Sequence, residues 1–552
     1  MSDPVSQSEP NTADRLALNN PAMNVPKKGI IPRLLHGTGA GAFGYGLGIA
    51  SNLLLLPLYL HRWSVAEYGE WMALYSVVMY LANLDFGVTT AAVNAATIAH
   101  ARNDWPTFKR VQGTAWAVSL VIAAFGGVLV AALSLFYFHV DRWLGLTVLG
   151  HHDARIIFCC LAVSLLANIP GAQLIAVYTS TGEFAKYQWL YNAYALFSCI
   201  VTAVALSLGA GPVSLAAVTA GTTLSTIATS LWLLSRKGSR LYPRLRDSRW
   251  HMARSLAAPT GQFGLTMLAS ALTIQGPIVV LSRALGGPAV ALFTTTRTVA
   301  NVVRGTLMLL RAPLRPEFSR ASALPTTDAL RRLFRFAVSL DVTIAISLSA
   351  VLWSGGVWLI RFWSHGRIHP DPMLLHLLLI ASVLEGFLQI LAIAGWATNQ
   401  FQAVSLGLLA SAVISLLVAV ALVGRFGPSA VPLGAIIPLI LIMTPVAVRN
   451  ACSEAHLTLW FVVGRLVLPF AAIVAFSASL PAWLASLRIA SPWLYGVVTS
   501  LAICAVAAFT GVAVFLTSED RKVVRDRIIV QFSRKKHPEV PQAAKDDSTM
   551  PA

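Results

Sequence analysis

Long apolar segments recur along the whole chain, and they constrain its fold more than any other feature. Each segment has about 20 residues or more, which lets a helix cross the hydrocarbon core of a bilayer. Hydrophobic residues make up 56% of the 552 residues and charged residues only 12%, about half the share in a soluble domain. We therefore expect an all-α polytopic membrane protein with about 14 transmembrane helices. The predicted spans are 37–60, 69–97, 112–139, 155–180, 186–208, 213–235, 257–282, 287–311, 335–361, 373–397, 402–424, 430–448, 458–484 and 493–517.

Basic residues indicate how these helices are oriented. When successive loops are assigned to alternate sides, thirty of the 41 lysines and arginines lie on the side of the N-terminus and eight on the other. Because cytoplasmic loops are enriched in Lys and Arg, both termini are predicted to be cytoplasmic, in a bacterial inner membrane. The net charge of +18 is then explained by topology and by contact with anionic lipids, and nucleic-acid binding is not expected.

An internal repeat predicts two lobes. Four residues of the first span recur 220 residues later in the seventh, and each set opens a unit of six spans. Because six is even, both units enter the membrane in the same direction, so we expect two six-helix lobes related by a pseudo-twofold axis along the membrane normal. The last two spans are additional. The matched pairs are Gly41 and Gly261, Phe43 and Phe263, Gly44 and Gly264, and Pro57 and Pro277.

This organisation divides the chain into six segments. They are a disordered cytoplasmic N-tail (1–30), an N-lobe (31–235), a basic cytoplasmic linker (236–254), a C-lobe (255–450), two additional helices (451–518) and a cytoplasmic C-tail (519–552). The longest extracytoplasmic loop, about 140–154, leaves no room for a catalytic domain. Neither a GxxxxGK[ST] motif nor a His, Asp and Glu cluster occurs. We therefore expect neither an enzyme nor a bound cofactor or metal.

Five polar residues of the eighth span follow each other at steps of 4, 3, 7 and 4, which places them on one helix face. An arginine at mid-bilayer costs at least about 2.5–3.5 kcal/mol. Arg297 and Arg304 therefore require water, an acidic partner or an anionic ligand. The outer two arginines, at or beyond the cytoplasmic membrane edge, are interpreted as topology anchors. The five residues are Arg297, Asn301, Arg304, Arg311 and Arg315.

The second span carries small polar residues on one face. Asn83, Thr90 and Asn94 are separated by 7 and 4 residues, so they share one side of a continuous helix. Such a face either holds helices together or contacts the hydroxyl groups of a substrate. Asp85 points away from it and is interpreted either as a structural cap or as an ion-coupling group.

Two further spans carry acidic residues. Glu385 lies in the middle of the tenth span, with Gln389 on the same face, and it is a candidate for coupling transport to H⁺ or Na⁺. Asp341 lies about two turns from the cytoplasmic end of the ninth span, and we interpret it as half of a structural ion pair.

Pro57 and Pro277 interrupt the first and seventh spans. Because proline has no backbone N–H, each frees a carbonyl group and bends its helix. Each bend is either a fixed kink or a hinge on which one lobe moves against the other.

The order of several motifs resembles a known family, the polysaccharide transporter branch of the MOP superfamily. That branch includes O-antigen and exopolysaccharide-unit flippases. Typical features are a proline-interrupted first helix, a Tyr-Gly turn, an Asp-Phe-Gly motif, a small Asn-rich helix and an arginine-containing eighth helix. Here these features fall on Pro57, Tyr68-Gly69, Asp85-Phe86-Gly87, Asn94, and Arg297 with the sequence LRPEFSR.

The resemblance implies a flippase that moves an undecaprenyl-pyrophosphate-linked oligosaccharide across the inner membrane by alternating access. Expected partners are this anionic cargo, membrane lipids, a polysaccharide polymerase and glycosyltransferases. Arg297 and Arg304 suit a pyrophosphate, because arginine binds phosphate oxygens bidentately. The alternative is a multidrug exporter of the same fold driven by an ion gradient, but such exporters favour cationic drugs and the spans carry few acids.

Overall fold

The computed structural model describes residues 30–135, 139–236, 241–311, 327–393 and 402–454, most of 458–471, and a few isolated residues (314, 318, 498, 501–506 and 509). Within these residues every regular element is a helix, which confirms the all-α prediction. The predicted N-tail, C-tail and most of the last two spans lie outside the described residues.

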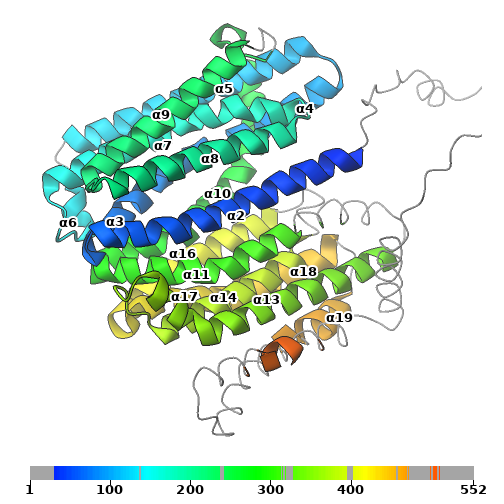
Figure 1. Cartoon of the computed structure of the whole chain (residues 1–552). Helices are drawn as coiled ribbons and strands as arrows, with labels where there is room; N and C mark the ends of the chain where they lie inside the picture. The colour runs from blue at the N-terminus through cyan, green and yellow to red at the C-terminus, as the bar shows by residue number, and fades with distance from the viewer. Residues whose placement is uncertain are drawn as a thin grey trace, which may run out of the picture.

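Figure 1 shows two groups of helices, one above the other. The first group contains the N-terminal helices, and short turns join them. Its members are α2 (Ile30–Arg62), α3 (Val65–Ala82), η1 (Asn83–Asp85), α4 (Val88–Ala101), α5 (Trp105–Leu135), α6 (Val140–Leu144), α7 (His151–Ser180), α8 (Phe184–Ser207) and α9 (Pro212–Arg236). A short helix, η2 (Leu245–Asp247), packs on α5 and leads to the second group.

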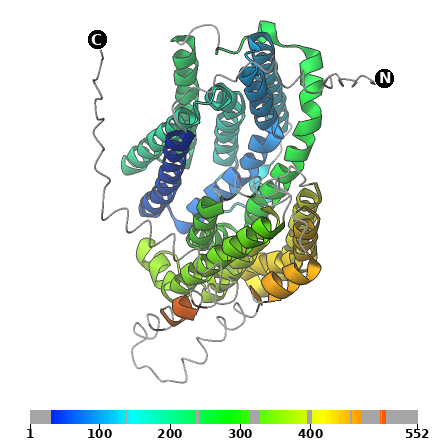
Figure 2. The same ribbon diagram turned by 90° about the vertical axis from the view of Figure 1, so that its right-hand side faces the viewer.

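The second group begins with the long helix α10 and ends in shorter pieces. Its members are α10 (Trp250–Leu285), α11 (Gly287–Arg311), α13 (Thr327–Trp363), α14 (Pro372–Leu391), α16 (Gln402–Phe426), η3 (Gly427–Ser429), α17 (Ala430–Pro438), η4 (Leu439–Met443), α18 (Thr444–Glu454), α19 (Leu459–Val462) and η5 (Val463–Val467). Helix α10 contacts α3, α4 and α5 of the first group as well as α11 and α16 of its own. Figure 2 shows it extending along both groups.

Ten stretches of the described helices are long and apolar enough to cross a membrane. Two differences separate this number from the first twelve predicted spans. Helix α11 is not among the ten, although its bounds, Gly287–Arg311, agree with the predicted eighth span. Residues 402–453 count as one stretch because α16, η3 and α17 to α18 follow without a break. The structure thus shows a multi-span helical membrane protein.

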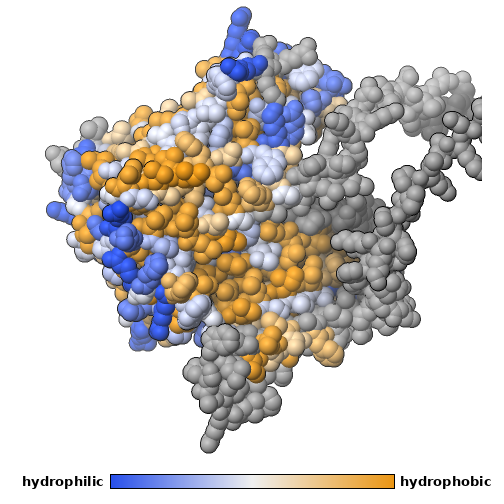
Figure 3. All heavy atoms as spheres, in the orientation of Figure 1, coloured by the Kyte–Doolittle hydropathy of each residue, from blue (hydrophilic) through white to orange (hydrophobic). Residues whose placement is uncertain are grey.

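The middle of the visible face is largely apolar, as contact with a bilayer requires. Figure 3 shows apolar side chains over the middle of the visible face and hydrophilic ones at its left end. On α5, Val121, Phe125 and Val128 are about two-thirds exposed, at 67%, 66% and 68%. Exposed apolar side chains at helical spacing on a long helix indicate contact with lipid.

The second predicted span lies within one apolar stretch, Val65–Ala101, but it is not one continuous helix, so the predicted helix face shared across residues 83–87 is wrong. Phe86 and Gly87 adopt left-handed conformations, with φ of 46° and 89°, and they separate α3 from α4. Glycine reaches positive φ without steric cost, so Gly87 permits the break. Asp85 Oδ2 accepts a hydrogen bond from the Thr89 N–H at 3.3 Å, which caps the first turn of α4. Asn83 therefore does not share a helix with Thr90 and Asn94.

The two groups of helices touch where α3 and α11 begin. A Cβ atom on Gly69 would overlap the carbonyl oxygen of Gly287, and one on Gly287 would lie 2.6 Å from the Ala66 carbonyl oxygen. Only glycines allow two backbones to approach so closely. Beside them, Glu70 is fully buried and accepts hydrogen bonds from the backbone N–H groups of residues 147–149 at 2.6–2.9 Å. This carboxylate fixes the segment that leads into α7.

Three more hydrogen bonds join the groups at the same end. Ser282 Oγ donates to the Leu144 carbonyl oxygen at 2.9 Å. Trp363 Nε1, at the end of α13, donates to the Leu53 carbonyl oxygen of α2 at 2.7 Å. Arg367 Nη1 donates to the carbonyl oxygen of Trp63 at 3.2 Å. The end of the molecule that carries the α2–α3, α5–α7 and α13–α14 connections is therefore firmly joined.

Candidate functional site

Helix α11 lies where the two groups of helices meet, and its charged residues define the candidate site. It packs against α3 of the first group and against α10, α13 and α14 of the second. The predicted face of this helix carries Arg297, Arg304 and Arg311, but the structure gives each arginine a different environment. The first and second are partly exposed, and the third is buried.

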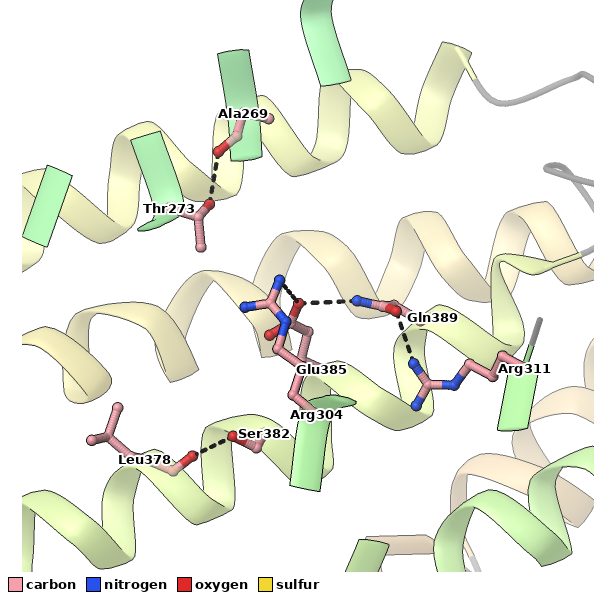
Figure 4. A network of polar contacts seen from close by, with 8 residues as sticks. All are labelled: Ala269, Thr273, Arg304, Arg311, Leu378, Ser382, Glu385 and Gln389. Atoms are coloured by element: carbon pink, nitrogen blue, oxygen red, sulfur yellow. Dashed lines mark hydrogen bonds and ion pairs between the residues drawn. The ribbon is translucent and has the colours of Figure 1, made fainter. Parts of the chain in front are cut away.

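Arg304 belongs to a continuous polar network, shown in Figure 4. Its Nη2 lies 3.0 Å from Oε1 of Glu385 on α14. The same carboxylate oxygen accepts a hydrogen bond of 3.0 Å from Gln389 Nε2. Gln389 Oε1 in turn accepts one of 2.8 Å from Arg311 Nη1. The helical spacing of Glu385 and Gln389 predicted their shared face, and the structure shows that this face meets α11.

Arg311 is buried and paired, whereas an arginine that serves only as a topology anchor would reach water; its position at the membrane edge stays a prediction. Its side chain is 9% exposed, and its Nε lies 2.8 Å from Oδ1 of Asp341, whose side chain is 3% exposed. A buried guanidinium needs a charged partner, and α13 supplies it. Asp341 is thus half of a structural ion pair, as predicted. Arg315 lies outside the described residues.

The network balances its own charges. Two guanidinium groups, of Arg304 and Arg311, face two carboxylates, of Glu385 and Asp341. Arg311 Nη2 and Asp341 Oδ2 are buried and have no hydrogen-bond partner within the described residues. They lie beside Gly386, where a Cβ atom would come within 3.0 Å and 3.5 Å of them. The absent side chain of Gly386 therefore leaves room for the buried pair.

Arg297 has no acidic partner among the residues that the structure describes. Its Nη1 donates a hydrogen bond of 2.6 Å to the Ile274 carbonyl oxygen, and its guanidinium lies 5.1 Å from the ring centre of Phe293. A carbonyl dipole and an aromatic ring stabilise a cation only partly. Arg297 is therefore the position on α11 that carries an uncompensated positive charge.

The two prolines each lie near a carbonyl that accepts a side-chain hydrogen bond. Pro57 lies inside α2, and the carbonyl four residues earlier, which its missing N–H frees, is that of Leu53, the acceptor for Trp363. Pro277 lies inside α10, and the acceptor for Arg297 is the carbonyl of Ile274, three residues earlier. Their role as hinges stays a prediction.

The other predicted substrate contacts lie on the opposite side of this interface or near it. Asn301 is exposed on α11, and its carbonyl oxygen accepts a hydrogen bond of 3.4 Å from the Tyr45 hydroxyl of α2. Asn83 donates to the Met79 carbonyl oxygen at 2.9 Å. Asn94 is exposed and Thr90 partly exposed on α4. Their role in substrate binding stays a prediction.

Tyr45 is a residue that the sequence analysis did not single out. A Cβ atom on Gly305 would overlap its hydroxyl group, so the glycine lets this ring reach α11 from α2. The signal in the sequence is weak, because Gly305 is one of 38 glycines and only the tertiary structure reveals what approaches it.

Comparisons with known proteins agree with this architecture. The profile of the family described as polysaccharide biosynthesis protein matches residues 40–322, just over half of the chain. No curated protein sequence matches the chain. Among solved structures, an inward-facing multidrug resistance MATE family transporter of the MOP superfamily is similar with a TM-score of 0.63 and 14% identity, over 74% of this chain and 95% of that chain. Its outward-facing counterpart gives 0.58 and 12%, over 77% and 96%.

The helix arrangement and these structural matches first define the class, a multi-span membrane protein with the fold of MOP-superfamily transporters. The family match then identifies one family within this class. The chain belongs to the polysaccharide biosynthesis protein family, which confirms the predicted resemblance. At 12–14% identity the solved structures show the fold alone.

Proposed function

We propose that this protein is a flippase that moves an undecaprenyl-pyrophosphate-linked oligosaccharide across the bacterial inner membrane by alternating access. The family supports a role in polysaccharide biosynthesis, and the fold supports transport. The observation that carries the proposal is the uncompensated guanidinium of Arg297 at the interface between the two groups of helices. A pyrophosphate supplies the negative charge that this position lacks.

Arg304 offers a second contact for the pyrophosphate. Its side chain is 39% exposed while it pairs with Glu385, so part of the guanidinium stays accessible. Seven residues separate Arg304 from Arg297, which corresponds to about 10 Å along the helix axis. A lipid-linked pyrophosphate that passes along α11 meets first one and then the other guanidinium.

Glu385 is the candidate for coupling transport to H⁺ or Na⁺. It holds Arg304 and Gln389 at once, so protonation or cation binding at this carboxylate weakens its hold on Arg304. That change frees Arg304 for the cargo. Asp85 is a weaker candidate, since its Oδ2 already caps α4.

Alternating access requires the contacts between the groups to break in turn. With both termini in the cytoplasm, the contact of Gly69 with Gly287 and the bond between Trp363 and Leu53 lie at the extracytoplasmic end. The described state is then closed on that side. Release of the cargo into the outer leaflet requires these contacts to separate, and bending at Pro57 accommodates the motion.

Multidrug export has less support. A cavity for cationic drugs needs accessible carboxylates, but Asp341 and Glu385 each pair with an arginine.

Polysaccharide polymerase and glycosyltransferases are the expected partners, because they consume and supply the cargo.

The test compares arginine variants for export of surface polysaccharide. We expect Arg297→Ala to abolish export while the protein reaches the membrane at normal abundance, measured by immunoblot of membrane fractions. Arg283→Ala, at an exposed position near the end of α10, is the matched control and should export normally. Normal surface polysaccharide in Arg297→Ala cells would contradict the proposal.

Arg304 needs a second comparison because its loss also leaves Glu385 unpaired. Arg304→Met alone and Arg304→Met with Glu385→Leu should both fail to export. If the double variant recovers export, Arg304 is only a structural partner of Glu385, and the pyrophosphate does not bind there.

A further inference from the structure

A cavity of about 380 Å³ lies within the first group of helices, apart from the arginines of α11. Its size falls within the range of about 300–1,000 Å³ that small-molecule sites occupy. Helices α7, α8 and α9 form its walls, and Tyr75 of α3 completes them. Because α3 also packs against α11, one helix connects the cavity with the candidate site.

Most of the residues that line this cavity bear a hydroxyl group. The lining residues of α9 follow at steps of 3 and 1, so they occupy one helix face. The tyrosines of α8 that line the cavity likewise occupy one face of their helix. The hydroxyl-bearing residues that line the cavity are Tyr75, Ser164, Tyr187, Tyr191, Tyr194, Ser198, Thr219, Thr222, Thr223, Thr226 and Ser230.

The threonines of α9 present hydrogen-bond acceptors to the cavity. Thr222 Oγ1 donates to the Val218 carbonyl oxygen at 2.7 Å, and Thr226 Oγ1 donates to the Thr223 carbonyl oxygen at 2.8 Å. Because each hydroxyl donates its single proton to a backbone carbonyl oxygen, its oxygen lone pairs remain free to accept a hydrogen bond. These oxygens can accept hydrogen bonds from the hydroxyl groups of a ligand.

Other lining groups supply donors. The hydroxyl groups of Tyr75, Tyr187 and Tyr191 make no hydrogen bond within the described part of the chain, and neither does the side-chain amide of Asn168. The rings of Tyr187 and Tyr191 are stacked, with centroids 6.4 Å apart. Tyrosine offers an apolar face as well as a polar hydroxyl, which matches a sugar ring with its C–H face and its hydroxyl edge.

The absence of charged side chains from the described lining of the cavity favours a neutral ligand. No Asp, Glu, Lys, Arg or His is among the described residues that line the cavity. A cation or an anion at this depth would lack a compensating charge, and desolvating it would cost several kcal/mol. A neutral ligand with many hydroxyl groups satisfies both the donors and the acceptors.

We infer that this cavity binds neutral sugar residues of the transported oligosaccharide, while the arginines of α11 bind its pyrophosphate. The inference rests on the proposed function, since it divides one cargo between two sites. The helix α3, which borders both, sets how far the sugar lies from the phosphate.

A binding experiment on the purified full-length protein in lipid nanodiscs tests this division. The probe is the lipid-free oligosaccharide released by mild acid hydrolysis from the lipid fraction of the host cells, measured by isothermal titration calorimetry. Thr222→Val with Thr226→Val removes two acceptors at nearly constant volume. At about 0.5–1.5 kcal/mol for each of the two hydrogen bonds, saccharide affinity should fall about 5- to 150-fold.

Thr229→Val is the matched control, because Thr229 is exposed on α9 and does not line the cavity. It should bind the saccharide as the wild type does. Inorganic pyrophosphate, titrated as a second probe, should bind equally to all three proteins. The inference is overturned if the wild type does not bind the saccharide, or if the double variant binds it with unchanged affinity.

The two proposals fail separately. If Arg297→Ala loses pyrophosphate binding and export while the cavity variants bind saccharide normally, the proposed function stands and the cavity inference is wrong. If saccharide binding depends on the two threonines but Arg297→Ala cells export normally, the arginine site is wrong and the cavity remains a saccharide site.

Discussion

Replacing Asp341 by Asn should strongly destabilise the second group of helices. The two side chains have nearly the same size, so the change removes charge without opening a cavity. It leaves the Arg311 guanidinium, 9% exposed, with only neutral hydrogen-bond acceptors, the new amide oxygen and Gln389 Oε1 at 2.8 Å, and without a counter-charge. Breaking a buried ion pair in this way costs about 3–5 kcal/mol, which lowers the folding equilibrium constant by about 10²–10³·⁵.

The free energy of unfolding can be measured by titrating the purified protein from mild detergent into SDS and following helix content by circular dichroism. Asp153→Asn is the matched control, because that carboxylate is 55% exposed and its loss should change the free energy by less than about 0.5 kcal/mol. Asp341→Leu combined with Arg311→Met removes both charges and should recover most of the stability.

A stability of Asp341→Asn equal to that of the wild type would refute this reasoning. It would mean that Arg311 reaches water or lipid headgroups, as a topology anchor does, and that its bond to Asp341 contributes nothing. A double variant that is no more stable than the single variant would show that packing around the pair, and not its charge, is what the Asn substitution disturbs.

Three further predictions concern the end where the two groups of helices meet. Glu70→Gln should leave at least one buried backbone N–H unpaired, cost about 1–3 kcal/mol and increase hydrogen–deuterium exchange over residues 147–149; unchanged exchange would contradict it. Trp363→Phe loses the bond to Leu53 and should open this end about fivefold more often, seen as faster exchange at the start of α3. Burial raises the pKa of Asp141, but the hydrogen bonds from His151 and from the backbone at Arg142 and Asp141 together outweigh burial and lower the pKa overall. The stabilisation from this carboxylate is therefore present above about pH 4 and lost as the pH falls through the lower folded value. Melting temperatures at pH 3–6 should show this loss for the wild type and not for Asp141→Asn.

The helices of this protein could be predicted from sequence because their cause is local. A run of about 20 apolar residues cannot leave its backbone polar groups unpaired in a bilayer, so it becomes a helix. The predicted eighth span, 287–311, has the bounds of α11. The break at residues 83–87 was missed because its cause is a single conformational choice, positive φ at Phe86 and Gly87, inside an otherwise apolar segment.

The candidate site was predictable only in part. Helical spacing placed Arg297, Arg304 and Arg311 on one face, but their partners lie on other helices. Arg311 donates hydrogen bonds to Asp341 and Gln389, which are 30 and 78 residues away in the sequence. No local sequence pattern therefore distinguishes Arg311 from Arg297. Similarly, the sequence TTLSTIATS shows a hydroxyl-bearing face of α9, yet the cavity exists only because faces of α7 and α8 meet it.

The sequence alone predicts a multi-span helical membrane protein, because hydrophobicity and segment length are properties of the residues themselves. It also shows that the predicted eighth span carries positive charge, since α11 contains Arg297 and Arg304 wherever it packs. Which of these charges is compensated depends on the packing of the helices. Packing brought Glu385 and Asp341 against two of the arginines and left Arg297 with a carbonyl oxygen and a ring, because the partner of a buried charge is fixed by three-dimensional proximity.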